Sequence, residues 1–252
     1  MTEVKVHGIV TAEAVMGDKD KRLTLLTREM GRITVLAKGA LAPKSRWRSV
    51  AQVFSCAAYV LTKGKTFYYI KEAELTDSLY ELRRDLPCLA WAGLMVETAS
   101  ETAVEGQPNQ PLVDLLLRGL MRMRQPESDP ALIASVFLWR LLADNGYRPQ
   151  LGCCRVCGRP DSKQEVWGFA AADGGLICPA CQTRYVPDQS LPPEARRALE
   201  YIISAPPEAV YRFRAEPDVR EALREGACRY LQYQTGGRYR SLDFLQQMER
   251  SG

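Results

Sequence analysis

The sequence predicts a mixed α+β protein of two domains, a small β-barrel followed by an all-α domain with an inserted four-cysteine zinc motif. Three observations lead to this prediction. Short apolar and β-branched runs fill residues 4–75, and helical spacing of apolar residues replaces them afterwards. Two C-x2-C pairs then interrupt the helical half of the chain. With 252 residues, of which 46% are hydrophobic, the chain is long enough to build two cores.

Five strands are expected in the first part of the chain, where short β-branched and apolar runs alternate with turn signals. They cover residues 4–10, 23–26, 33–36, 54–61 and 67–70. Lys63-Gly64-Lys65 is expected to form the hairpin turn between the last two. Five short strands in this length are typical of the OB-fold, a small barrel that often binds oligonucleotides. We therefore place an OB-fold domain at residues 1–80.

Helical spacing of apolar residues begins after Thr76-Asp77 and predicts an all-α domain over residues 81–252. Several of the expected helices start at a proline, a residue favoured in the first helical turn. The expected helices cover residues 87–104, 111–123, 129–145, 192–203 and 217–233, with a last one from 241. The zinc motif, at residues 153–181, interrupts this domain.

Four cysteines in two close pairs predict a metal site. Cys154 and Cys157 are followed by Cys178 and Cys181. Each C-x2-C turn brings two sulfurs to one side of a metal, so the four thiolates suit one tetrahedral Zn²⁺. Cys153 is a competing ligand, although the shorter spacing favours Cys154. We expect one structural zinc ion, because a catalytic zinc keeps a coordination position open for water.

Enzymatic chemistry is disfavoured by the single histidine of the chain, His7, which lies in the first expected strand. Zinc deaminases need an H-x-E or C-x-E motif beside the metal, and the sequence has neither. Gly64-Lys65-Thr66 is similar to the end of a phosphate-binding loop, but Tyr59 stands where the opening glycine belongs. No catalytic residue is therefore predicted.

The distribution of charge points to a polyanionic partner. The formal net charge is only +4, yet no acidic residue stands between Glu29 and Glu72. Carboxylates in that stretch would repel phosphates, so their absence favours nucleic-acid binding. The candidate DNA contacts in the first domain are Arg22, Arg32, Lys38, Lys44, Arg46, Trp47, Arg48, Lys63 and Lys65. A second acid-free stretch, between Glu225 and Asp243, adds Arg229, Arg238 and Arg240.

Aromatic residues near these cations have two possible roles. They can stack on unpaired bases, or they can fill the barrel, because alternation along a strand turns about half of its side chains inward. Both roles remain open for Trp47 at this stage. The other residues concerned are Tyr59, Phe67, Tyr68 and Tyr69.

The lack of a recognisable targeting signal predicts a cytoplasmic location. The chain has no run of about 18 apolar residues that would span a membrane, and its first ten residues do not form a signal peptide. Cys56, Cys88 and Cys228 lie apart within apolar surroundings, where buried core thiols are expected.

The succession of segments resembles the RecO family of bacterial recombinational-repair proteins. Single motifs here are weak, whereas their common order along nearly the whole chain is specific. The segments are Gly8-Ile9-Val10, residues 20–27, Ala37-Lys38-Gly39-Ala40, Lys44-Ser45-Arg46, the two cysteine pairs with Phe169 and Gly174-Gly175, and residues 240–245. Residues 15–18 depart from the aromatic-Gly-Glu pattern frequent in the family. The resemblance also favours Cys154 over Cys153.

The resemblance implies a DNA repair and recombination mediator without catalytic activity. Its OB domain would bind single- and double-stranded DNA and anneal complementary strands. It would help load the RecA recombinase onto strands coated by single-stranded-DNA-binding protein (SSB), in the RecF pathway. The implied partners are RecR, the C-terminal tail of SSB and, in some lineages, RecF, with RecA engaged only indirectly. A nucleoid-associated, cytoplasmic location follows.

Two other functional classes remain as alternatives. A zinc-containing OB-fold protein that binds RNA or accompanies transcription would share the barrel and its basic face. A zinc-dependent enzyme is the other, and the lack of a second histidine argues against it.

Overall fold

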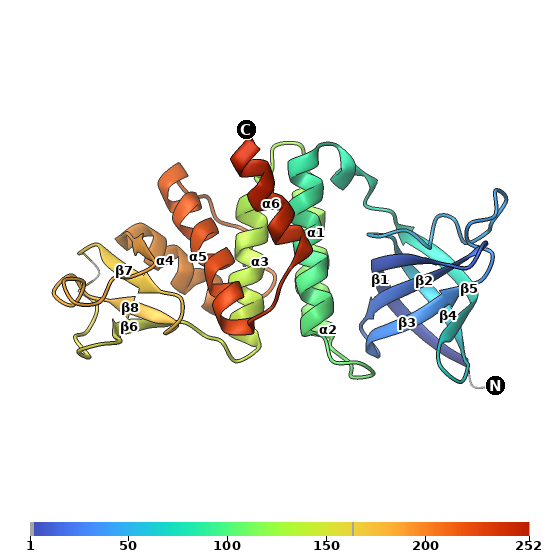
Figure 1. The fold of residues 1–252 in the computed structure, drawn as a ribbon, viewed down its shortest axis with the longest axis horizontal. Helices are drawn as coiled ribbons and strands as arrows, with labels where there is room; N and C mark the ends of the chain where they lie inside the picture. The colour runs from blue at the N-terminus through green and yellow to red at the C-terminus, as the bar shows by residue number, and fades with distance from the viewer. Residues whose placement is uncertain (1–2, 163, 252) are drawn as a thin grey trace. The chain divides into compact units, whose positions relative to one another are not determined.

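The computed structural model describes residues 3–162 and 164–251, and the chain forms two compact units (Figure 1). The N-terminal unit is Met1–Pro126 and the C-terminal unit is Glu127–Gly252. Each unit has its own core, so each is described by itself. The N-terminal unit extends beyond the barrel because two helices pack on the barrel wall.

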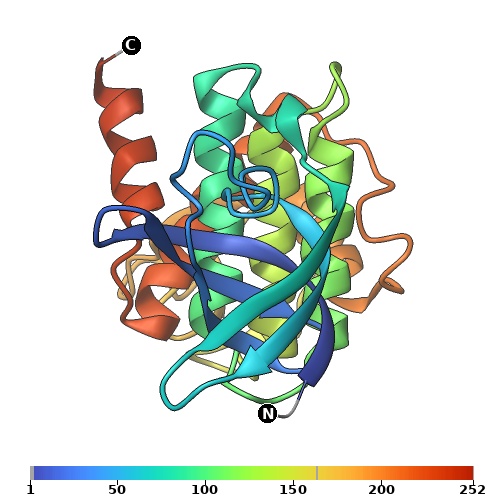
Figure 2. The same ribbon diagram turned by 90° about the vertical axis from the view of Figure 1, so that its right-hand side faces the viewer.

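Five strands close into a barrel in the order β1-β2-β3-β5-β4 (Figure 2). Their bounds are β1 Glu3–Met16, β2 Asp20–Thr27, β3 Gly31–Ala37, β4 Cys56–Lys63 and β5 Tyr68–Asp77. Strands β3 and β5 pair in parallel, and the other neighbours are antiparallel. This five-stranded closed barrel has the architecture of the OB-fold. The predicted fold class, an OB-like barrel followed by helices and a cysteine cluster, is confirmed.

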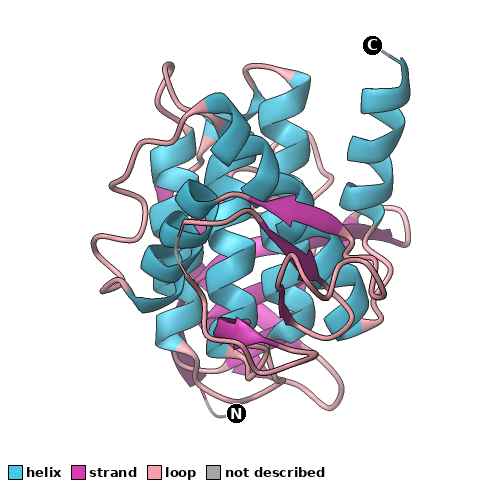
Figure 3. Cartoon of the chain, turned by 90° about the vertical axis from the view of Figure 1, so that its left-hand side faces the viewer, coloured by secondary structure: helices cyan, strands magenta, loops and turns pink. Residues whose placement is uncertain are grey.

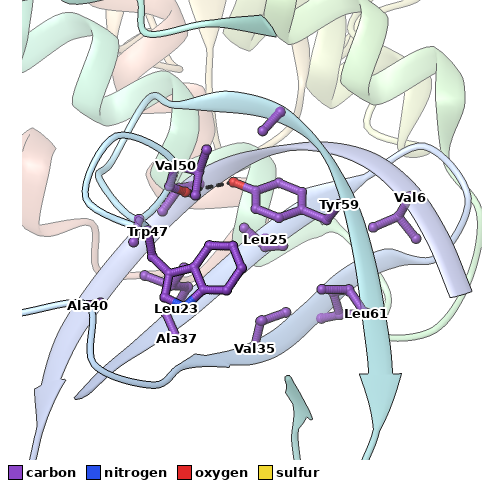
Figure 4. Close-up of a cluster of buried hydrophobic side chains, with 14 residues drawn as sticks. Val6, Leu23, Leu25, Val35, Ala37, Ala40, Trp47, Val50, Tyr59 and Leu61 are labelled. Carbon is purple, nitrogen blue, oxygen red and sulfur yellow. Dashed lines mark hydrogen bonds between the residues drawn. The ribbon is translucent and has the colours of Figure 1, made fainter. Parts of the chain in front are cut away.

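The barrel interior is filled from the strands and from the loop at residues 38–55 that joins β3 to β4. Alternate residues of the strands, such as Leu23 and Leu25 on β2, point inward and are fully buried. Trp47 and Val50 of the loop belong to the same cluster, and Tyr59 donates its hydroxyl proton to the Val50 carbonyl at 2.8 Å (Figure 4). The loop therefore completes the barrel core.

Helices α1 (Leu86–Thr102) and α2 (Gln110–Met123) complete the N-terminal unit after the short 3-10 helix η1 (Tyr80–Arg83). Asp85 and Asn109 cap their first turns by accepting backbone N–H groups. Polar contacts join them to the barrel: Thr11 donates to the Ser100 hydroxyl at 3.1 Å, and Arg28 pairs with Asp114 at 2.7 Å. The helices thus cover one side of the barrel wall.

The C-terminal unit is built on α3 (Pro130–Asp144), α4 (Pro193–Ser204), α5 (Pro217–Thr235) and α6 (Arg240–Ser251). An aromatic cluster joins the helices to the sheet of this unit, with the ring centroids of Trp139, Phe169 and Tyr230 between 5.2 and 5.5 Å apart. The indole N–H of Trp139 donates to the Leu223 carbonyl on α5 at 3.0 Å. Among the described helices, none is both long and apolar enough to cross a membrane.

A four-stranded sheet in the order β6-β8-β7-β9 carries the cysteine pairs (Figure 3). Its strands are β6 Gln150–Cys154, β7 Trp167–Ala170, β8 Gly175–Ile177 and β9 Gln189–Leu191. The sequence predicts a metal motif here but no sheet, because strands of three to five residues show too little alternation to be detected.

Candidate metal centre and nucleic-acid interface

The four predicted cysteines converge at one point of the C-terminal unit. The sulfur atoms of Cys154, Cys157, Cys178 and Cys181 all lie within 4.8 Å of one another. The Sγ atoms of Cys157 and Cys178 are 3.7 Å apart. Zn–S bonds of about 2.3 Å place the sulfurs of a tetrahedral site about 3.8 Å from one another, so the four thiols need little movement to bind one ion. This group can hold a metal ion, and its donor set suits zinc.

Both cysteine pairs have matching backbone turns. The Gly158 N–H donates to the Cys154 carbonyl at 2.9 Å, and the Gln182 N–H, four residues after Cys178, donates to the Cys178 carbonyl at 3.2 Å in the same way. Gly158 has a φ of 74°, a conformation that favours glycine. The Cys178 N–H also donates to the Cys154 sulfur at 3.3 Å. These turns hold both pairs in a conformation that is ready for a ligand.

Hydrogen bonds to sulfur change the acidity of this group. Burial acts to raise the pKa of Cys154, but N–H donors from the backbone of Cys178, Cys157 and Val156 outweigh it and lower the pKa to about 6. Thiol contact with Cys157 and burial raise the pKa of Cys181 to about 12. A divalent cation binds cysteines as thiolates, so metal binding at this cluster would release protons.

A buried ion pair connects the metal-binding segment to α4. The guanidinium of Arg196 lies 3.1 Å from the Asp161 carboxylate, and the two side chains are 2% and 5% exposed. Arg196 also donates to the backbone carbonyls of Glu165 and Leu191. Sequence reasoning missed this pair, since its partners are 35 residues apart and follow no local pattern.

The other cysteines lie outside the cluster. Cys153 is adjacent to Cys154 but is not among the convergent thiols, so the preference for Cys154 agrees with the geometry. Cys88 is buried, as expected, whereas Cys56 and Cys228 are only partly buried. Burial raises the pKa of both Cys56 and Cys228 to about 12, so neither is a reactive thiolate at neutral pH.

The barrel carries a group of cations that have no acidic partner among the described residues. We call them the unpaired cations, and all are exposed: Arg22, Lys38, Lys44, Arg46, Arg48, Lys63 and Lys65. Some other basic residues of the same barrel are paired: Lys21 with Glu13, Arg28 with Asp114 and Lys71 with Glu3. The unpaired cations therefore leave a net positive charge on the surface.

Strand register brings several of these cations together. Arg22 on β2 faces Leu36 on β3, and Leu36 faces Tyr69 on β5. The ammonium of Lys38, which directly follows β3, lies 4.9 Å from the centre of the Tyr69 ring. Lys63 at the end of β4 pairs with Tyr68. Arg22, Lys38 and the partly exposed Tyr69 thus lie along one face of β2, β3 and β5 at one end of the barrel, whereas Lys63 shares the face of Tyr68, which packs against the barrel core.

The structure corrects the expectation for Trp47. Its side chain is 8% exposed and belongs to the barrel core, so it does not offer a face for stacking on a base. The Arg46 guanidinium lies over the ring at 4.1 Å and covers it further. Tyr59, 1% exposed, is also a core residue. The two large aromatic side chains fill the barrel core, and this packing outweighs the alternative role that the sequence left open.

The remaining candidate arginines lie on other elements, and Arg32 and Arg229 among them hydrogen-bond to backbone carbonyls. Arg32 donates to the Ser100 carbonyl on α1 at 3.2 Å, which makes it a link between barrel and helix. Arg229 donates to the Asp188 carbonyl, Arg238 is exposed, and Arg240 begins α6. His7 lies on β1, as expected, with its Nδ1 2.8 Å from Glu29.

The fold and the sites together define a class: an OB-type barrel with an unpaired basic face, joined to a helical unit with a four-cysteine metal centre. Comparisons with known proteins agree with this class. Residues 1–79 match the sequence model of the family "Recombination protein O N terminal", and residues 83–243 match that of "Recombination protein O C terminal". The chain belongs to the RecO family of DNA repair and recombination proteins.

Curated relatives are similar along nearly their whole length. The chain is 31% identical to "DNA repair protein RecO" of Exiguobacterium sibiricum over 254 residues, with 98% of each chain covered. It is 30% identical to the protein of that name in Desulforudis audaxviator, again with 98% of each chain covered. For the Acetivibrio thermocellus protein the identity is 29%, with 99% of each chain covered.

Proposed function

We propose that this protein binds single- and double-stranded DNA through the unpaired cations of its barrel and anneals complementary strands. One observation carries the proposal: in a chain of the RecO family, the barrel displays exposed cations without acidic partners, in contrast to the paired cations beside them. Residues 1–80 would be the DNA-binding domain. Residues 81–252 would form the helical domain that carries the metal motif.

Annealing needs electrostatic screening and no catalytic residue. Two complementary strands repel each other through their phosphates, and a surface with unpaired cations lowers that repulsion for both. Contacts to phosphates carry no sequence information, so the bases stay available to pair. Tyr69 beside Lys38 adds one partly exposed aromatic face where an unpaired base can rest.

The resident metal is proposed to be one structural Zn²⁺, held by Cys154, Cys157, Cys178 and Cys181. Four thiolates fill a tetrahedral coordination shell and leave no position for a reacting water. The ion would supply folding energy to the C-terminal unit, and the buried Arg196–Asp161 pair would connect the metal-binding segment to α4.

Partner proteins are proposed from the family alone. RecR, the acidic C-terminal tail of SSB and, in some lineages, RecF are the expected partners, and loading of RecA onto SSB-coated strands is the expected outcome. Arg229, Arg238 and Arg240 are further candidate DNA contacts in the C-terminal unit. The proposed location is cytoplasmic, with the nucleoid.

An annealing assay tests the proposal. Two complementary oligonucleotides, one carrying a fluorophore and one a quencher, are mixed with and without this protein, first bare and then coated with SSB. We expect faster annealing in both cases. If the protein does not accelerate annealing of DNA and binds structured RNA more tightly, the RNA-binding alternative replaces this proposal.

A further inference from the structure

A hollow of about 680 Å³ opens at one end of the barrel, within the N-terminal unit. Its walls come from the β1–β2 hairpin, from the loop between β3 and β4 and from Arg83 of η1. The volume falls in the range of about 300–1,000 Å³ typical of small-ligand sites.

The charges in the hollow favour an anion. Lys21 is held by the Glu13 carboxylate at 3.0 Å and by the Ala51 carbonyl at 3.1 Å, so this pair is neutral. Arg83 donates to the Val53 carbonyl at 2.7 Å and keeps its charge. Arg48 is exposed and has no acidic partner among the described residues. Two guanidinium groups therefore give the hollow a net positive charge, and their planar donors suit a phosphate.

The rest of the wall is aliphatic. Leu41, Pro43 and Val53 line it, and Leu41 is 39% exposed. None of the described residues that line the hollow is aromatic. A ligand that combines a phosphate with a larger, weakly polar group would satisfy both parts of the wall, and a nucleotide has this combination.

The backbone beside the hollow is strained. Phe54, which directly follows Val53, has a φ of 73°, a conformation that bulky residues rarely adopt. Its N–H donates to the Val10 carbonyl at 2.9 Å, and its ring lies 5.4 Å from the Arg83 guanidinium. This conformation fixes the direction of the neighbouring Val53 carbonyl, which in turn holds Arg83. Strain of this kind is concentrated at ligand sites, where it holds a binding geometry in advance.

We propose that the hollow receives one unpaired nucleotide of a bound DNA strand, with a phosphate at Arg48 and Arg83 and the base against Leu41 and Pro43. The proposal rests on the proposed DNA binding and adds a defined subsite to it. Arg48 belongs both to the unpaired cations and to the hollow, so a strand that follows the basic surface reaches this site. A paired base cannot enter, and the subsite therefore favours single strands.

Oligonucleotides that contain 2-aminopurine test this inference, because the fluorescence of this base rises when it leaves a stack. One oligonucleotide carries the probe at its 5′ end and another in its interior. We expect fluorescence to rise when the wild-type protein binds at least one of them. A rise for the terminal probe alone identifies a strand end as the ligand, and a rise for the interior probe identifies an internal base.

Leu41→Asp places a negative charge in the hollow, and Leu75→Asp is its matched control. Leu75 is 38% exposed, lies on β5 of the same barrel and does not line the hollow, so both variants change the net charge equally. We expect Leu41→Asp to abolish the fluorescence rise and to lower single-strand affinity about tenfold relative to Leu75→Asp. Gln52→Glu, an isosteric change of an exposed lining residue, should act in the same direction.

Equal behaviour of Leu41→Asp and Leu75→Asp, in variants with equal melting temperatures, would overturn the nucleotide subsite. The absence of a fluorescence rise for both probes would overturn it as well. In both cases a steep salt dependence of wild-type binding would leave the proposed DNA-binding function intact, so the two proposals fail separately.

Discussion

Basic residues have opposite surroundings in the two units of this protein. On the barrel, Lys38, Lys65 and the other unpaired cations are exposed and lack acidic partners among the described residues. In the C-terminal unit many arginines are paired, and Arg196 is buried against Asp161. A buried cation that is paired with a carboxylate helps to fix the fold around it. An exposed cation without such a partner can bind an external anion. The contrast predicts that most phosphate contacts are made by the barrel, whereas the paired arginines of the C-terminal unit stabilise its fold.

The largest effect is expected from loss of a metal ligand. Cys178→Ser should destabilise the C-terminal unit by about 5 kcal/mol or more, because metal binding supplies folding energy to a small cysteine-rich module. Thermal unfolding, together with zinc quantification, measures this. Cys153→Ser is the matched control, since Cys153 lies next to the cluster but outside it. Equal melting temperatures and metal contents for both variants would contradict the four-thiol assignment.

Breaking the buried ion pair should have the next largest effect. Arg196→Ala leaves the Asp161 carboxylate buried without its cation, and we expect a loss of about 3–5 kcal/mol in the free energy of unfolding. The neighbouring Arg197 pairs with Glu194 on the surface, where both side chains are more than half exposed. Arg197→Ala should therefore cost less than about 1 kcal/mol. Similar losses in denaturant titrations of the two variants would remove the distinction between buried and exposed pairs.

Substitutions of Trp47 distinguish a role in core packing from a role in stacking on DNA bases. Trp47→Ala should lower the free energy of unfolding by about 3 kcal/mol, because it leaves a cavity in the barrel core. Trp47→Phe keeps most of the volume and should retain both stability and DNA affinity. A full loss of affinity in Trp47→Phe, with unchanged stability in urea titrations, would restore the stacking role.

The smallest effect is expected from removing a single cation of the barrel. Its size should depend on whether that cation has an acidic partner. Lys65→Ala should reduce the slope of log affinity against log salt by about 0.7, because one phosphate contact with a single strand disappears. Lys71 pairs with Glu3 at 2.7 Å, so Lys71→Ala removes a cation that is already neutralised. Fluorescence anisotropy at several salt concentrations should show a smaller change for Lys71→Ala. A larger change for Lys71→Ala would mean that pairing does not decide which cations bind.

Much of the fold could be predicted because it depends on local patterns. Alternation of apolar residues marks the barrel strands, and prolines mark the helix starts at Pro130, Pro193 and Pro217. The strand β1 continues to Met16, beyond its predicted end at residue 10, because its exposed part has no apolar alternation. The small sheet β6–β9 was missed for the same reason: its strands are too short to show a period.

The candidate sites, like the fold, could be predicted only where a local sequence pattern determines them. The convergence of four cysteines could be predicted, since the two C-x2-C spacings suit the geometry of a single tetrahedral ion. The basic stretch after Glu29 was visible from composition, but composition does not show which side chains are exposed. Trp47 and Arg32 are drawn into packing by residues distant in sequence, as in the Arg32 contact with Ser100. Contacts over such separations leave no trace in a local pattern.

The salt dependence of single-strand binding by the wild-type protein tests the central claim most directly. If the unpaired cations bind phosphates, log affinity should fall linearly with log salt concentration, with a slope steeper than about −2. The slope should be the same for strands of different sequence. Affinity that barely changes between low and high salt, or that depends chiefly on base sequence, would contradict the account.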